Sequence, residues 1–204
     1  MKYIRIYEEN PNPRQVEQVC DVLNAGGVII YPTDTIYGLG CDIFHSKAVE
    51  RIAMLKGLKP SKANFSFIVS DLSRLSDYTR PLSNSIFKLM KANFPGPFTF
   101  VLPASNKVPK ILENKKKTVG IRIPDNSIIL EIARSFGRPI LTTSVHDIDF
   151  IVEYTTDPEL IFENFKDKID LMVDGGYGGN IPSTVVDCTN EEPKILRQGL
   201  GILK

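Results

Sequence analysis

The chain has 204 residues and a formal net charge of +1 at pH 7, so it lacks the overall basic character of a protein that binds nucleic acid by charge alone. Its hydrophobic fraction of 42% and charged fraction of 24% are ordinary for a globular protein, and the length suits one domain over residues 1–204. Three cysteines lie far apart without a C-x-x-C spacing, at Cys20, Cys41 and Cys188, which argues against a disulfide framework and a zinc site.

The lengths of the apolar stretches in the chain indicate where in the cell the protein is found. Residues 1–13 lack the continuous apolar stretch of a signal peptide. No window approaches the roughly 18 apolar residues that are needed to span a bilayer. We therefore expect a cytoplasmic protein.

The first predicted helix begins after Asn12, which can cap it, with Pro13 at the first helical position and a glycine at 26 or 27 to end it. Its apolar residues recur at helical spacing, at Val16, Val19, Cys20 and Leu23. A strand at 27–32 follows. Ser46 can then cap a second helix, which ends before Gly57.

Strand-like and helix-like segments alternate through the rest of the chain. Strands are predicted at 64–70, 98–103, 118–124, 139–144, 170–174, 183–187 and 194–197. Helices are predicted around 82–90, from 128 to a stop at Gly137, and over 157–165. Because several strands follow one another without a helix, the pattern favours an α/β (α+β) fold, a single domain with a twisted mixed β-sheet and flanking helices.

The segment YPTDTIYGLGCD at 31–42 ends a buried strand in hydroxyls and glycines. It is either a tight structural turn or a backbone arranged around a ligand. The glycines at 38–40 and in GGYGGN at 175–180 match neither a P-loop nor a dinucleotide fingerprint, so we interpret both as turns with positive φ.

Cationic and hydroxyl side chains gather near predicted strand and helix ends. They are Thr33, Thr35, Lys56, Lys59, Thr99, Arg122, Thr143, Ser144, Ser183, Thr184 and Arg197. Such a set suits an anion, since Lys and Arg supply charge-assisted hydrogen bonds and hydroxyls orient the bound group. Each residue taken alone has an ordinary structural role; only the set indicates a site.

Other kinds of active site find little support. The two histidines, His45 and His146, form no ligand-like pair, and no nucleophile motif accompanies them. The lysines at 115–117 suit a solvated turn, with phosphate binding as the less favoured alternative. The sequence predicts no metal site.

Taken in order, the motifs resemble those of the YrdC/YciO family, which includes threonylcarbamoyl-AMP synthases that serve the N6-threonylcarbamoyladenosine modification of tRNA. They are YPTDTIYGLGCD, LKGLKP, PGPFTFVLP, VGIRIP, LTTS, PSTVVD and ILRQG, and they cover nearly the whole chain. The resemblance implies a single YrdC-like domain with a concave basic cavity where threonine and ATP meet.

The resemblance also implies residue roles. Lys56 and Arg122 would be catalytic. Substrate binding would fall to Thr33, Thr35, Lys59, Thr99 and Thr143, and nucleotide binding to Ser144, His146, Ser183, Thr184 and Arg197. ATP would be a substrate carried with Mg²⁺, with threonine and bicarbonate as the other ligands and no tightly bound cofactor.

Two motifs depart from the family pattern. The K-x-R motif reads Lys56-Gly57-Leu58, and the S-x-N motif reads Ser144-Val145-His146, which places the chain closer to the YciO branch. These changes predict slow synthesis or another substrate. The alternative function is a double-stranded RNA or tRNA-binding module without catalysis; a hydrolase ranks last.

Overall fold

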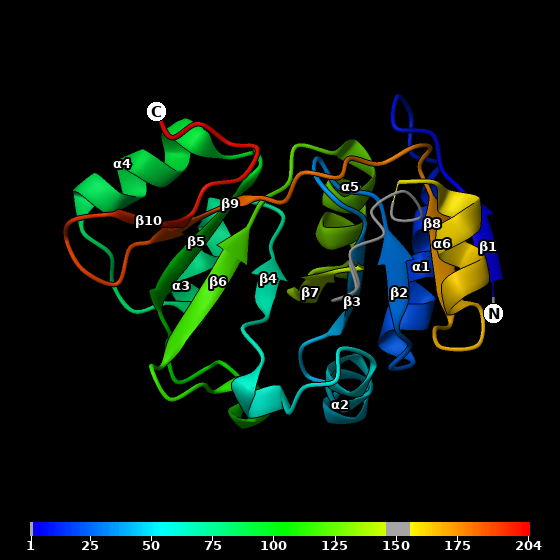
Figure 1. Cartoon of the computed structure of the whole chain (residues 1–204), viewed down its shortest axis with the longest axis horizontal. Helices are drawn as coiled ribbons and strands as arrows, with labels where there is room; N and C mark the ends of the chain where they lie inside the picture. Colours follow the sequence, from blue (N-terminus) through cyan, green and yellow to red (C-terminus); the bar gives the residue numbers. More distant parts are fainter. Residues whose placement is uncertain (1, 146–155) are drawn as a thin grey trace.

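The computed structural model describes residues 2–145 and 156–204 and confirms the predicted single α/β domain with a mixed twisted sheet (Figure 1). Ten strands of the described residues form one sheet. In spatial order they are β1 (Lys2–Arg5), β8 (Leu171–Asp174), β2 (Ile29–Tyr31), β3 (Gly38–Asp42), β7 (Ile140–Ser144), β4 (Ser66–Ile68), β6 (Thr118–Arg122), β5 (Phe98–Pro103), β9 (Thr184–Asp187) and β10 (Lys194–Arg197). The sheet is mixed because β2 pairs parallel with β8 and antiparallel with β3.

Helices flank this sheet along its length. The described α-helices are α1 (Pro13–Asn24), α2 (Ser46–Leu55), α3 (Leu75–Tyr78), α4 (Asn84–Asn93), α5 (Ser127–Phe136) and α6 (Pro158–Phe165), with short 3₁₀ turns η1 (Pro60–Lys62), η2 (Leu72–Arg74) and η3 (Lys110–Leu112). Figure 1 places α4 near β10 at one end of the sheet and α1 and α6 near β1 at the other. Among the described residues, none of the helices has the length and apolar character required to cross a membrane.

Local signals set the start of α1 and the end of α5 as predicted. The side chain of Asn12 accepts a hydrogen bond from the Arg14 N–H at the start of α1, where Pro13 occupies the first helical turn. Gly137 ends α5 with φ 71°, the left-handed conformation that glycine adopts without a Cβ penalty. Ser46 is the first residue of α2 rather than its cap, which is His45.

The core is divided between the two faces of the sheet by the two-residue period of a strand. In β2, Ile30 packs into the cluster that includes residues of α2 and α6. Its neighbours Ile29 and Tyr31 pack into the other cluster, with α1 and α5. All three side chains have an exposed fraction of 0%. Burial of each such side chain contributes about 1.5–3 kcal/mol to stability.

The prediction that the glycines at 38–40 form a turn is wrong. Gly38 and Gly40 lie in β3, which pairs with β2 and β7, and neither has a positive φ. Their missing side chains leave room for the buried ring of Tyr31. A Cβ at Gly38 would lie 2.6 Å from Tyr31 Cε2, and one at Gly40 would lie 2.9 Å from the same ring and collide with the Leu141 carbonyl oxygen. The turn prediction is confirmed at Gly176, which has φ 90°. Strands β1 and β3 were not predicted.

Candidate functional site

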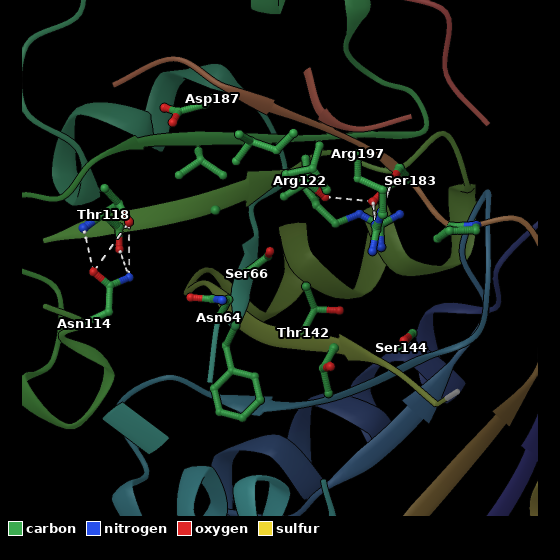
Figure 2. Close-up of a pocket in the computed structure, with 18 of the residues that line it drawn as sticks. Asn64, Ser66, Asn114, Thr118, Arg122, Thr142, Ser144, Ser183, Asp187 and Arg197 are labelled. Carbon is green, nitrogen blue, oxygen red and sulfur yellow. Dashed lines mark hydrogen bonds between the residues drawn. The ribbon is translucent and has the colours of Figure 1, made fainter. Parts of the chain in front are cut away.

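One half of the sheet consists of strands β7, β4, β6, β5, β9 and β10. One face of this half borders a cavity of about 580 Å³ (Figure 2). Alternate residues of β5, β6 and β9 line it, as in β6, where Thr118, Gly120 and Arg122 face the cavity. Between them Val119 and Ile121 point into the hydrophobic core. The cavity is therefore the uncovered polar face of strands whose other face is packed.

The cavity wall carries more positive than negative charge. Its described lining residues include the cations Lys116, Arg122 and Arg197 and the single carboxylate Asp187. Figure 2 shows the two arginines together at one end, with Asp187 toward the opposite end. The arginine end has the character of an anion site.

Arg122 is the most constrained cation of the cavity. Its side chain is 10% exposed, and its Nη2 donates to Thr35 Oγ1 at 2.9 Å and to Asp34 Oδ1 at 3.2 Å. Burial lowers the pKa of Arg122, and Asp34 opposes that shift. The guanidinium stays charged, because arginine titrates far above neutral pH. Its Nε is the one buried side-chain nitrogen or oxygen without a hydrogen-bond partner among the described residues.

Arg197 reaches the same end of the cavity from the edge strand β10. Its Nη2 donates to the Ser183 carbonyl oxygen at 2.8 Å and lies 3.4 Å from Ser183 Oγ. The hydroxyls of Ser183 and Thr99 are 2.9 Å apart. Burial lowers the pKa of Arg197. Two arginines and two buried hydroxyls thus meet where β5, β6, β9 and β10 lie adjacent.

The hydroxyls of segment 31–42 are arranged around Arg122. Thr33 Oγ1 donates to the Ile36 carbonyl and lies 3.1 Å from Thr35 Oγ1, so Thr33 supports Thr35 from behind. Thr35 lines the cavity and contacts Arg122. Of the two interpretations of this segment, a backbone and hydroxyls arranged around a cavity describes residues 33–35, whereas residues 38–42 continue the sheet as β3.

The cavity floor contains contacts that only small or hydroxyl side chains allow. Tyr31 Oη donates to Thr142 Oγ1 at 2.8 Å from below the floor, and burial raises the pKa of Tyr31 above its usual range. Gly120 lies beneath the cavity, where a Cβ would come 2.5 Å from Ser66 Oγ. At the far end Asn114 Nδ2 donates to the Thr118 carbonyl at 2.9 Å.

The structure brings most of the predicted site residues to this cavity. The lining includes Thr35, Thr99, Arg122, Thr143, Ser144, Ser183 and Arg197. Lys56, at the end of α2, lies outside the lining but donates from Nζ to the Ser144 carbonyl at 3.2 Å, so it reaches the rim. Lys59 is exposed outside the lining, and His146 lies outside the described residues.

The structure places Thr184 differently from the prediction. Its side chain has an exposed fraction of 0% and points away from the cavity, donating to the Gly201 carbonyl at 2.6 Å and accepting from the Gly199 N–H at 3.0 Å. Ser183 and Val185 face the cavity instead. Thr184 therefore anchors the segment that follows β10.

Sequence reasoning missed a further set of lining residues. These are Asn64, Ser66, Asn114, Lys116, Thr118, Gly120, Thr142, Asp187 and Thr189. The missed signal is the alternation of small or polar residues within the predicted strands themselves, as in Thr-Val-Gly-Ile-Arg of β6.

The described residues contain no cluster of three or more His, Cys, Asp or Glu side chains that could hold a metal ion. Mg²⁺ prefers oxygen ligands and commonly binds through substrate phosphates. Asp187 is the only carboxylate among the described lining residues. These donors fit Mg²⁺ that arrives bound to a nucleotide better than Mg²⁺ held by the protein alone.

Comparison with known proteins gives this cavity a context. A family model described as "Telomere recombination", that of the Sua5/YciO/YrdC domain, matches residues 21–199. The chain belongs to the Sua5/YciO/YrdC family. Within it, the "Uncharacterized protein YciO" of Escherichia coli strain K12 is 40% identical over 205 residues, covering 100% of this chain and 98% of that protein. The crystal structure of E. coli YciO matches with a TM-score of 0.91 over the same shares of the two chains.

Members of the Sua5/YciO/YrdC family with a named activity or a named ligand are more distant. A threonylcarbamoyl-AMP synthase of Bacillus subtilis is 33% identical over 200 residues, which are 97% of this chain and 56% of that protein. The P. abyssi Sua5 structure complexed with L-threonine matches with a TM-score of 0.86 and 29% identity, covering 98% of this chain and 58% of that one. The chain thus spans little more than half the length of these two relatives.

Proposed function

We propose that the cavity binds ATP, threonine and bicarbonate and transfers the adenylyl group to form threonylcarbamoyl-AMP, in support of tRNA modification. The observation that carries the proposal is the meeting of Arg122 and Arg197 with buried hydroxyls in a cavity of about 580 Å³. This volume is typical of small-molecule sites. Relatives named as threonylcarbamoyl-AMP synthases at 30–33% identity support the same reaction.

The proposed chemistry needs positioning and charge neutralisation rather than a protein nucleophile. The threonine amine and bicarbonate form a carbamate with loss of water. A carbamate oxygen then bonds to the α-phosphorus of ATP while the bond from that phosphorus to the bridging oxygen of the β-phosphate breaks, and pyrophosphate leaves. Arg122 and Lys56 would offset the negative charge that develops, and Thr33 and Thr35 would shape the amino-acid pocket.

The remaining predicted site residues, which lie in or next to other strands, would bind the nucleotide and the substrate. Ser144, Ser183 and Arg197 would hold the nucleotide, and Thr99 and Thr143 would contact the substrate. All five residues line the cavity, which supports these roles. Thr184 is left out, because its hydroxyl is engaged with Gly199 and Gly201.

The rate of this reaction is proposed to be low. Leu58, which stands where the family motif has arginine, is 46% exposed in the turn after α2, and its side chain has no hydrogen-bond donor. Lys59, one residue later, is exposed outside the described lining. The proposed site therefore lacks a forked cation beside Lys56.

Pyrophosphate release tests the proposal. With ATP, threonine, bicarbonate and Mg²⁺ together, we expect slow pyrophosphate formation, and none when threonine is left out. Omission of bicarbonate from degassed buffer is the second control, because carbamate formation requires it. Equal release with and without threonine would mean simple ATP hydrolysis, and no release would reject synthesis.

Lysines on two neighbouring turns support RNA binding as a second candidate function. Turn η1 contacts η3 beside the cavity. Exposed lysines stand on these turns or next to them in the chain, at Lys59, Lys62, Lys110 and Lys115–Lys117. Such a cluster suits a phosphate backbone. The net charge of +1 for the whole chain favours the enzyme as the main proposal.

The RNA candidate predicts a specific salt dependence. Changing Lys115, Lys116 and Lys117 to alanine should weaken binding of a short RNA duplex and lower the slope of log K against log salt concentration by about 2–3, because fewer counterions are released. A control variant with three exposed lysines changed elsewhere, Lys47, Lys88 and Lys91, should keep the parent slope. Equal slopes in both variants would reject this surface as the RNA site.

A further inference from the structure

Asp34 lies behind the cavity wall, next to the anion-binding end. It is not among the lining residues, and its side chain is 8% exposed. Oδ1 accepts from Arg122 Nη2 at 3.2 Å, and Oδ2 accepts from the Asp125 N–H at 3.0 Å. Because both carboxylate oxygens are engaged, Asp34 is a fixed point between segment 31–42 and the end of β6.

Only part of the Arg122 guanidinium is hydrogen-bonded within the described residues. Nη2 serves both Asp34 and Thr35, whereas the buried Nε has no hydrogen-bond partner among the described residues. A buried donor without a partner destabilises the folded state, so its presence beside a cavity marks a place where a further acceptor is expected.

We propose that Asp34 is a positioning residue for anion binding, which holds Arg122 by Nη2 and so keeps the other donors of the guanidinium oriented for a ligand oxygen. The inference rests on the proposed function only in taking that ligand to be a phosphate or carboxylate. Orientation matters because the guanidinium is a rigid planar fork, which binds an anion well from particular directions.

Two effects of Asp34 on an anion have opposite signs, which makes the inference testable. As a negative charge near the site, Asp34 repels the ligand, so its neutralisation should strengthen anion binding. As the group that orients Arg122, its loss should weaken anion binding. The sign of the change in affinity therefore separates a positioning residue from a mere counter-charge.

The test is calorimetric titration of Asp34→Asn and the parent with AMP, and with adenosine, which has the same base and sugar but no phosphate. We expect the affinity for AMP to fall about tenfold in the variant, while the affinity for adenosine changes less than about twofold. A variant whose structure had merely loosened would lose affinity for both ligands alike.

A matched control comes from another buried carboxylate of this chain. Asp42 on β3 has an exposed fraction of 2% and pairs with Arg138 at 2.8 Å, outside the cavity lining. Asp42→Asn should leave both affinities at parent values. If Asp34→Asn does not fold, Thr35→Val removes the other acceptor of Arg122 Nη2 and should lower the affinity for AMP in the same direction.

Each result decides the inference. Equal or tighter AMP binding by folded Asp34→Asn would overturn the positioning role, and so would a parallel loss of adenosine affinity. A parent protein that binds neither AMP nor ATP with Mg²⁺ would overturn the proposed function itself and the inference with it. That failure is seen in the parent alone, so the two are distinguishable.

Discussion

Replacing Arg122 with alanine is expected to lower the free energy of unfolding by about 3–5 kcal/mol at pH 8 and to remove most of the affinity for AMP. The stability loss follows because Asp34, with its side chain only 8% exposed, would stay buried without its counter-charge. The loss of affinity follows because the guanidinium is the most buried cation of the cavity. Urea denaturation and calorimetric titration measure the two effects.

The stability loss in Arg122→Ala should depend on pH in a defined direction. Burial raises the pKa of Asp34 above its ordinary value of 3.8, and Arg122 opposes that shift, so its removal raises the pKa further. A folded state with the higher pKa binds the proton more tightly than the unfolded state. The associated stability is therefore present at low pH and is lost as pH rises through the folded pKa. The deficit of the variant should be smaller at pH 5 than at pH 8.

A double variant separates the two consequences of losing Arg122. Asp34→Asn combined with Arg122→Ala removes the unpaired charge, so it should recover most of the stability but none of the affinity for AMP. If the single variant Arg122→Ala is as stable as the parent, the buried Asp34–Arg122 pair does not make the expected contribution to stability. Parent-like AMP affinity in either variant would contradict the assignment of Arg122 to the site.

Replacing Arg197 with alanine is expected to weaken AMP binding by roughly 10- to 150-fold while changing the free energy of unfolding by less than about 1 kcal/mol. The guanidinium bonds to the carbonyl and hydroxyl of Ser183, and among the described residues it has no carboxylate partner that its loss would leave buried. The Arg197→Ala and Arg122→Ala variants should therefore differ sharply in the free energy of unfolding, while both should lose affinity for AMP.

Two further variants complete the test of Arg197. Arg197→Lys keeps a positive charge but loses the fork, so it should recover part of the affinity. Arg134→Ala, on the exposed side of α5, is the matched control and should bind AMP as the parent does. If Arg197→Ala binds AMP with parent affinity, the end of β10 does not belong to the nucleotide site.

Local chemistry determined most of the secondary structure from the sequence alone. Residues 98–103 were predicted as a strand and form β5 with the same bounds. Asn12 and Pro13 began α1 as predicted, and Gly137 ended α5. These signals depend on backbone sterics and on hydrogen bonds within a few residues, so a single sequence contains them. The order of motifs also indicated the family, which the comparisons show.

The cavity was predictable only in part, because its residues come together through pairings between distant strands. Strand β5 lies between β6 and β9, and β9 pairs with β10, so Thr99, Arg122, Ser183 and Arg197 meet although they span nearly half the chain. A strand presents alternate residues to opposite faces, and the sequence does not state which face a helix will cover. For this reason Thr142 and Gly120 were missed.

Thr184 and the glycines at 38 and 40 show most clearly what only the tertiary structure decided. Thr184 was predicted beside Ser183 in the site, but adjacent strand residues point in opposite directions, and the packing of 199–201 took its hydroxyl. Gly38 and Gly40 were predicted as a turn from their residue type, yet they form a strand that pairs with β2 and β7, and the ring of Tyr31 occupies the space of their two missing side chains. Turn propensity is a property of neighbouring residues in the sequence. It is overridden here by the pairing of β3 with β7, in which Leu141 and Thr142, about a hundred residues away in sequence, lie next to Gly40.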